Sequence, residues 1–254
     1  MTTNDEPFLR LGPAEARGWL AAHPDALRLD AREARDFEAG HLPGSVRLDG
    51  RNHEALLLRQ SKTRPVFVYC YHGHASQAYA RMFVDFGFAT VADLIGGHEA
   101  WLREPPPALR AWLDAEGFAD AAGAGRHGNT PLMHAAWRGD AAAVDALLEL
   151  GVDLEAVNAD GNNALWLACV HGDTALVRRL VEAGVPIDHA NLTGATALMY
   201  AASSSKPQVV GTLLALGADP GLQTQDDFTA LDMAASLECL NLLRAAAPRA
   251  LAAS

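Results

Sequence analysis

The sequence predicts two structural parts: an α/β domain with a central parallel sheet, followed by an all-α solenoid of about four repeats. In the first part, short apolar runs alternate with helical segments, which is typical of parallel strands covered by helices. In the second part, glycines recur in two series with a spacing of 33 residues, which is typical of a repeated helical unit. The series are Gly128, Gly161, Gly194 and Gly151, Gly184, Gly217.

The size of the chain allows both parts to fold. It has 254 residues, of which 50% are hydrophobic and 20% charged, so it has enough apolar side chains for a real core and does not have a disordered composition. We expect one domain over residues 1–104, a Pro-rich linker with a short capping helix over 105–125, and repeats over 126–250.

The charge is acidic and the cysteines are few. With 20 basic and 31 acidic residues the net charge is −11, which disfavours nucleic acid and anionic membrane surfaces as partners. Three widely spaced cysteines cannot form a disulfide framework and fit a reducing compartment. No secretion signal or membrane span is indicated, and the expected location is the cytoplasm.

The elements of the first part follow from its apolar pattern. Strands are expected at 27–29, 45–48, 66–69 and 91–94, and helices at 13–22, 33–38, 52–59, 75–86 and 99–102. Strands separated by helices predict a parallel sheet wrapped on both faces. Ligands of such folds bind beyond the carboxyl ends of the strands.

Cys70 is expected at that edge of the sheet. The run Val66–Tyr69 leads directly into Cys70 and a short loop, and a helix follows. Backbone N–H groups at the start of a helix are unpaired and the helix dipole is positive there, so a Cys70 thiolate would be stabilised and its pKa lowered. Gly73 lets the loop bend back toward the sulfur without a side chain in the way.

Four segments of this part, in order, resemble the signatures of a rhodanese domain over about residues 8–104. They are 29–32 (LDAR), 37–45 (FEAGHLPGS), 70–76 (CYHGHAS) and 96–101 (GGHEAW). The Cys-Tyr-His-Gly loop is similar to that of single-domain bacterial thiosulfate sulfurtransferases.

The resemblance implies an enzyme that moves sulfane sulfur through a persulfide of Cys70, the catalytic residue. The donor is thiosulfate or a persulfide, and the acceptor is a thiol or cyanide. The terminal sulfur would be ringed by backbone amides of the substrate-binding residues, which are Tyr71, His72, Gly73, His74, Ala75 and Ser76. No metal or organic cofactor is required.

Two other chemistries of a cysteine loop fit these residues less well. Cysteine phosphatases and arsenate reductases carry an Arg six positions after the cysteine to grip an oxyanion, whereas this chain has Ser76 there and no Arg or Lys at 71–80, which disfavours phosphate ester hydrolysis. Cys70, His72 and His74 also read as a zinc pattern, but no fourth ligand is evident.

The same lack of cations predicts weak binding of thiosulfate, a dianion. His72 and His74 are the only cationic candidates of the loop and are mostly neutral at pH 7. We therefore expect that the physiological donor is a persulfide, and that thiosulfate turnover improves as the pH falls toward about 6.

Other signature residues are interpreted as structural. An internal ion pair is favoured for Asp30 and Arg32, with substrate contact as the alternative. His41 and Trp101 are also expected to support the fold, and burial is the default for the tryptophan.

The second part resembles the ankyrin repeat over about residues 126–247. Each unit is expected to contain a polar turn, a short Ala-rich helix and a second helix with an apolar pair. The usual histidine after Leu is missing from every unit, only the first unit has the Pro, and the fourth unit is four residues shorter, as a terminal repeat can be. The resemblance implies protein binding, and the acidic surface predicts that a partner, or another part of this chain, offers a basic patch.

Cysteines and histidines of the repeats are interpreted as structural. Cys169 and Cys239 occupy positions that carry Ala or Val in neighbouring units, so both are expected in the core. Structural roles are likewise favoured over metal binding for the histidines, which are His127, His134, His171 and His189.

A run of three prolines, Pro105 to Pro107, ends the first part. A short helix over 108–117 is expected to pack on the first repeat as a cap, with a free linker helix as the alternative. Two functional hypotheses result. One is a sulfurtransferase whose repeats dock a protein, and the other is a binding scaffold whose first domain has low activity and senses persulfide or oxidation.

Overall fold

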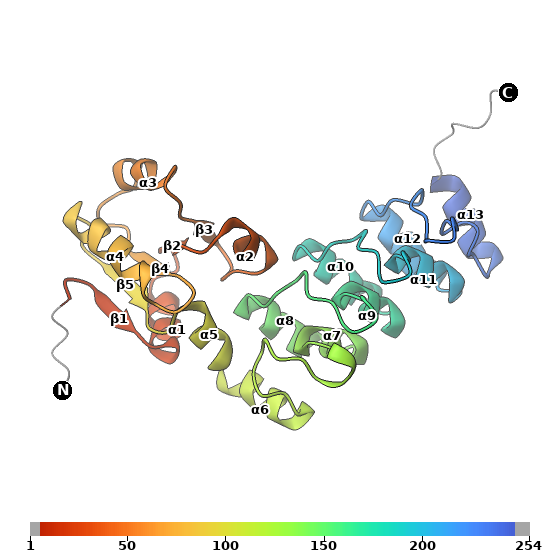
Figure 1. Ribbon diagram of the computed structural model, residues 1–254, viewed down its shortest axis with the longest axis horizontal. Coiled ribbons are helices and arrows are strands. Elements are labelled where there is room, and N and C mark those ends of the chain that lie inside the picture. Colours follow the sequence, from red (N-terminus) through yellow and green to blue (C-terminus); the bar gives the residue numbers. More distant parts are fainter. Residues whose placement is uncertain (1–5, 247–254) are drawn as a thin grey trace. The chain divides into compact units, whose positions relative to one another are not determined.

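The computed structural model describes residues 6–246, which form two compact units (Figure 1). The first unit contains the chain up to residue 122 together with 149–153, and the second contains 123–148 and the chain from 154 onward. Within residues 6–246 no helix is both long and apolar enough to cross a membrane.

The first unit is built on a five-stranded sheet with the order β1-β5-β4-β2-β3, and every neighbouring pair is parallel. The strands are β1 (Leu9–Leu11), β2 (Leu27–Asp30), β3 (Ser45–Arg47), β4 (Val66–Tyr69) and β5 (Val91–Leu94). The predicted parallel sheet is confirmed. Sequence reasoning missed β1, because this strand has three residues, lies at an edge and leaves Leu9 half exposed.

Both faces of the central strand β4 are covered, as its unbroken apolar run predicts. Val66 and Val68 belong to a core cluster that also contains Phe83 of helix α4 (Ala75–Asp85). On the opposite face, Phe67 packs against Trp19 of helix α1 (Pro13–Ala22), with ring centroids 5.9 Å apart. All four residues of β4 are buried, so the residue that follows this strand has a fixed position.

The remaining helices of the first unit lie near their predicted positions. They are α2 (Ala34–Ala39), α3 (His53–Arg59), α5 (Gly97–Arg103) and α6 (Pro107–Glu116). Helix α5 begins two residues earlier than expected, directly after Gly96, which has a φ of 72°. Helix α6 ends at Gly117 in the left-handed conformation, and Leu109 and Leu113 on this helix are buried. Contacts group α6 with the first unit.

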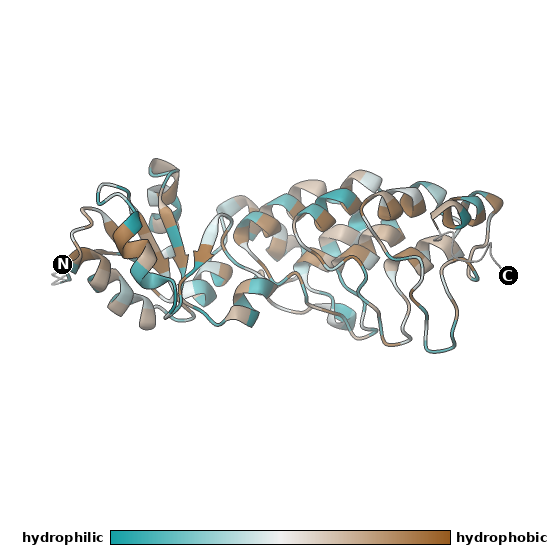
Figure 2. Ribbon diagram, turned by 90° about the horizontal axis from the view of Figure 1, so that it is seen from above, coloured by the Kyte–Doolittle hydropathy of each residue, from teal (hydrophilic) through white to brown (hydrophobic). Residues whose placement is uncertain are grey.

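The second unit is a stack of helix pairs whose connecting loops extend away on one side (Figure 2). Its helices are α7 (Pro131–Arg138), α8 (Ala141–Leu150), α9 (Ala164–His171), α10 (Thr174–Glu182), α11 (Ala197–Ser203), α12 (Pro207–Ala215) and α13 (Leu237–Ala246), preceded by the short 3₁₀ helix η1 (Arg126–Gly128). The side chains of Thr130, Asn163 and Thr196 cap the first helix of each of three units. Cys169 and Cys239 are fully buried, which confirms their predicted place in the core.

The fourth repeat departs from the predicted pair of helices. Residues 230–233 form only a turn, so α13 stands alone in this unit. Asp232 replaces the apolar residue found at this position in the other units, and its carboxylate accepts hydrogen bonds from the backbone N–H and hydroxyl of Thr229. A polar residue at this position and a shorter segment leave too little apolar surface for a packed first helix.

Candidate active site at the Cys70 loop

Cys70 lies at the carboxyl end of β4, as predicted, and its sulfur is surrounded by hydrogen-bond donors. The Ser76 backbone N–H, in the first turn of α4, donates to Sγ at 3.4 Å. Burial raises the pKa of Cys70, but hydrogen bonds from the Ser76 hydroxyl, when it donates to Sγ, and from the N–H groups of Ser76, His72 and Gly73 outweigh burial and lower the pKa below its ordinary value. The residue is only 2% exposed.

The start of α5 holds the loop in that conformation. The N–H of His98 donates to the Cys70 carbonyl at 2.8 Å, and the N–H of Glu99 donates to the Tyr71 carbonyl at 3.2 Å. A Cβ on Gly97, which has a φ of 61°, would lie 2.4 Å from the Cys70 carbonyl oxygen. Because the two carbonyls are engaged by α5, the N–H groups of the loop remain available to the sulfur.

Gly73 is required for a related reason. It has a φ of 74°, and a Cβ there would lie 2.7 Å from both the Gly96 nitrogen and the Leu94 carbonyl oxygen. The loop therefore closes against the end of β5 through backbone alone. The two glycines after β5 are functional residues that the sequence reasoning used only as a signature.

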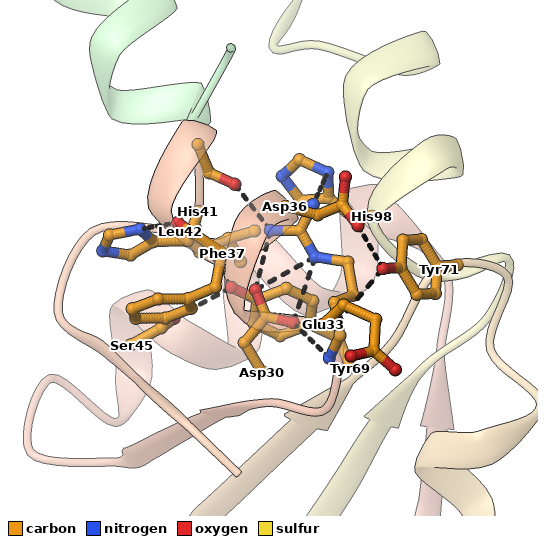
Figure 3. Close-up of polar contacts among 12 residues, drawn as sticks. Asp30, Glu33, Asp36, Phe37, His41, Leu42, Ser45, Tyr69, Tyr71 and His98 are labelled. Atoms are coloured by element: carbon orange, nitrogen blue, oxygen red, sulfur yellow. Dashed lines mark hydrogen bonds and ion pairs between the residues drawn. The ribbon is translucent and has the colours of Figure 1, made fainter. Parts of the chain in front are cut away.

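Side chains of the other proposed binding residues mostly point away from the sulfur. The Tyr71 hydroxyl accepts a hydrogen bond from the Glu33 N–H at 3.1 Å and donates to the Asp36 carboxylate (Figure 3). His72 pairs with Glu99, with 2.6 Å between Nδ1 and Oε2. His74 and Ala75 are exposed.

A set of hydrogen-bonded polar side chains adjoins the sulfur, and the sequence pattern does not predict it. The Cys70 thiol donates to Ser76 Oγ at 3.5 Å, the Ser76 hydroxyl donates to Asp93 Oδ2 at 3.1 Å, and Arg10 Nε donates to Asp93 Oδ1 at 3.0 Å. Burial raises the pKa of Asp93, and the Arg10 guanidinium only partly offsets this. The signal in the sequence was a charged residue inside an apolar strand.

Asp30 and Arg32 form the internal ion pair that was predicted. Both are buried, and Arg32 Nη2 lies 2.7 Å from Asp30 Oδ2. A second guanidinium nitrogen of Arg32 donates to His98 Nδ1 at 3.1 Å (Figure 3), so the proton of the neutral imidazole is on Nε2. Burial first, and then the Arg32 charge, lower the pKa of His98 to about 4.

Other signature residues are structural. Trp101 is buried, and His41 stacks on Phe37 with ring centroids 4.0 Å apart. Among residues 6–246 no three His, Cys, Asp or Glu side chains are grouped to hold a metal ion.

A cysteine that follows the central strand of a parallel sheet, ringed by the amides of a short loop, defines a class of α/β proteins with a cysteine loop of the rhodanese type. The sequence profile of the Rhodanese-like domain matches residues 13–104, and that of Ankyrin repeats, in three copies, matches residues 132–224.

Curated relatives agree over the first unit. The chain is 34% identical over 99 residues to "Thiosulfate sulfurtransferase GlpE" of Pseudomonas savastanoi pv. phaseolicola (strain 1448A / Race 6), which covers 39% of this chain and 92% of the relative. The protein of the same name from Stutzerimonas stutzeri (strain A1501) is 35% identical over 99 residues, or 39% of this chain and 89% of the relative. The chain belongs to the rhodanese family, and its second unit carries ankyrin repeats.

Proposed function

We propose that the chain is a sulfurtransferase that carries sulfane sulfur as a Cys70 persulfide. The Cys70 thiolate attacks the outer sulfur of the donor. A bond forms between Sγ and that sulfur, the sulfur–sulfur bond of the donor breaks, and sulfite leaves with the electron pair when the donor is thiosulfate. A thiol or cyanide then attacks the outer sulfur, and Cys70 leaves as the thiolate.

The observation that carries this proposal is the set of donors around Sγ. Hydrogen bonds from backbone N–H groups favour sulfur in its anionic form, and amides of the loop 71–76 would bind the charged outer sulfur in the same way. The curated relatives that match this unit are named thiosulfate sulfurtransferases, which supports the same chemistry.

We propose a persulfide as the preferred donor over thiosulfate. His72, a cationic candidate for the dianion, is paired with Glu99, and Glu99 also pairs with Arg103 at 2.5 Å. Each of these charges is therefore partly neutralised by a neighbour, and none is dedicated to a second negative charge on the donor. The reacting group of a persulfide carries one negative charge, so it needs a binding site for only one.

Sulfur loading of Cys70 tests the proposal directly. The full-length protein is incubated with thiosulfate or with glutathione persulfide, and the Cys70 peptide is examined by mass spectrometry. We expect an addition of about 32 Da, one sulfur atom, in the wild type and none in Cys70→Ser. Glutathione persulfide should load Cys70 at a lower concentration than thiosulfate does.

The matched control is Cys169→Ala, because alanine occupies the equivalent position in two neighbouring repeats. This variant should load like the wild type. Absence of the addition with both donors, or an equal addition in Cys70→Ser, would remove the proposal. If the Michaelis constant for thiosulfate does not change with pH, the histidines do not assist anion binding.

We further propose that the domain boundaries are 1–104, 105–125 and 126–250.

We also propose that the repeats bind a protein with a basic patch. The net charge of −11 supports a basic partner, and three free cysteines support the cytoplasm as the compartment. Capture with the full chain as bait, at low and high ionic strength, tests the partner. A partner retained only at low ionic strength fits the proposal, and capture that is insensitive to salt contradicts it.

The second candidate function is a binding scaffold whose first unit senses persulfide or oxidation. The near-complete cover of Cys70 favours this candidate, because slow access to the sulfur reduces turnover. The two candidates differ in kinetics. An enzyme releases sulfur to cyanide or a thiol over many cycles, whereas a sensor loads once and keeps its modification.

A further inference from the structure

Two acceptors, Cys70 Sγ and Asp93 Oδ2, compete for the hydroxyl hydrogen of Ser76. Ser76 Oγ lies 3.5 Å from Cys70 Sγ and 3.1 Å from Asp93 Oδ2. A hydroxyl has a single hydrogen, so it can donate to only one of the two at a time. Ser76 and Asp93 are both 0% exposed, so bulk water does not replace the bond that is lost.

The Asp93 carboxylate, when ionised, is the stronger acceptor for this hydrogen. The carboxylate is buried and needs donors, and within residues 6–246 its side-chain donors are Ser76 Oγ and Arg10 Nε. When Ser76 donates to Asp93, its oxygen presents a lone pair to Sγ. A thiol at Cys70 can donate to that lone pair, but a bare thiolate cannot and is repelled by it.

We propose that Asp93 is a positioning residue that directs the Ser76 hydroxyl away from Cys70, and so favours the thiol and the persulfide of Cys70 over its bare thiolate. The persulfide part rests on the proposed sulfur transfer. In that step Sγ becomes a neutral bridging sulfur, and the negative charge moves to the outer sulfur, about 2 Å farther along the new bond. The unfavourable contact between charge and lone pair is relieved as the persulfide forms.

Among residues 6–246, three other charged side chains lie near the hydrogen-bonded set of Cys70, Ser76 and Asp93. From β1, Arg10 bonds to Asp93 and also donates to the Gly73 carbonyl at 3.3 Å. Glu6, just before β1, adds a negative charge that raises the pKa of Asp93 further. From α5, Glu99 faces the loop through its pair with His72. Arg10 thus opposes protonation of Asp93, and it also links the carboxylate to the Cys70 loop.

The test is the rate at which iodoacetamide alkylates Cys70 in the full-length protein, followed by mass spectrometry of the Cys70 peptide from about pH 5 to about pH 10. In Asp93→Asn, the side-chain NH₂ can donate to Ser76 Oγ while its oxygen still accepts from Arg10. The Ser76 hydrogen is then free for Sγ. We expect the midpoint of the profile to fall by about one pH unit, or roughly tenfold faster alkylation on the acidic side.

Two controls separate the hydroxyl from other effects. Asp85→Asn makes the same change of charge at the exposed far end of α4, about 13 Å along the helix from Ser76, and should leave the midpoint unchanged. In a Ser76→Ala background, Asp93→Asn should change the alkylation rate on the acidic side by less than about twofold, because the hydroxyl that Asp93 directs is gone. The midpoint should therefore hardly move.

A full shift in the Ser76→Ala background would mean that Asp93 acts by its charge alone, and the proposal would be wrong. The proposal also fails if Asp93→Asn folds and its profile matches that of the wild type. Should Asp93→Asn not fold, Asp93→Leu, which has the same branched shape, a larger volume and no acceptor, replaces it with the same expected direction.

Sulfur loading gives a second readout. At a fixed ratio of thiosulfate to sulfite, the fraction of Cys70 present as persulfide should fall about fivefold in Asp93→Asn, since the thiolate is no longer disfavoured. An unchanged fraction contradicts the preference for the persulfide. If the wild type takes up no sulfur at all, the proposed function fails, and the alkylation profile still decides whether Asp93 directs Ser76.

Discussion

Cys70 in the first unit and Cys169 in the second are buried to nearly the same extent, 2% and 0% exposed, yet their pKa values move in opposite directions. Burial raises the pKa of Cys169 to about 12, and the opposing effect of the Lys206 charge is smaller. At Cys70 hydrogen bonds outweigh burial and lower the pKa. What surrounds a buried thiol, and not how deeply it is buried, determines whether it can ionise.

The two architectures explain this difference. Cys169 lies within helix α9, where backbone N–H groups are used by the helix itself and the side chain packs among apolar residues. Cys70 follows a strand and precedes a helix, where N–H groups are unpaired. A solenoid buries a cysteine as a small apolar residue, whereas the carboxyl edge of a parallel sheet surrounds it with donors.

The largest expected effect is on alkylation of the two thiols in the folded wild type. At about pH 8, a pKa of about 12 leaves roughly one Cys169 in ten thousand ionised. We expect iodoacetamide to modify Cys70 about a thousandfold faster than Cys169, as measured on the two peptides by mass spectrometry. Similar rates would break the comparison, because the donors around Cys70 would then have no effect on its reactivity.

A second prediction extends the comparison to a buried base, His98. Its pKa is about 4 in the folded chain against an ordinary 6.5, so between these values the unfolded chain binds a proton that the folded chain does not. Stability therefore falls as the pH drops from about 6.5 to about 4, by about 3 kcal/mol from this residue, and the loss is complete below that range.

The measurement is urea unfolding of the full-length wild type and of full-length His98→Gln. Hydrogen exchange of β4 reports the unfolding of the first unit. The variant should lose about 3 kcal/mol less than the wild type over this pH range. The control His74→Gln changes an exposed histidine and should match the wild type. Equal losses in wild type and His98→Gln would show that burial beside Arg32 does not disfavour the charged imidazole.

The smallest expected effect concerns the backbone that holds the donors in place. In Gly97→Ala, the new Cβ would lie 2.4 Å from the Cys70 carbonyl, so the loop must shift and we expect alkylation of Cys70 to slow about tenfold. Gly87→Ala is the matched control, because Gly87 also has a positive φ but nothing lies within 4 Å of its added Cβ.

Both glycine variants lose about 1–2 kcal/mol of stability from the strained backbone, which thermal unfolding measures. Only Gly97→Ala should change the chemistry of Cys70. If the two variants alkylate Cys70 at the same rate, the contact between α5 and the loop does not orient the donors.

Much of the fold could be predicted because local patterns and tertiary packing agree. The run Val66–Tyr69 is buried on both faces, so its apolar pattern gave the bounds of β4 correctly. Edge strand β1 has only three residues and one packed neighbour, and therefore left no such pattern. The turn at 230–233 was missed because a repeat pattern persists in the sequence after the packing that supports a helix is lost.

The sequence by itself determined the order of the elements, the repeats, and the position of Cys70 between a strand and a helix, because these depend on the local periodicity of apolar residues. Only the tertiary structure decided that Asp93 and Arg10 lie beneath Ser76, that His72 pairs with Glu99, and that the Gly97 backbone holds the loop. Each of these contacts joins residues from different strands and helices, and their distances are set by packing of the whole unit and not by spacing along the chain.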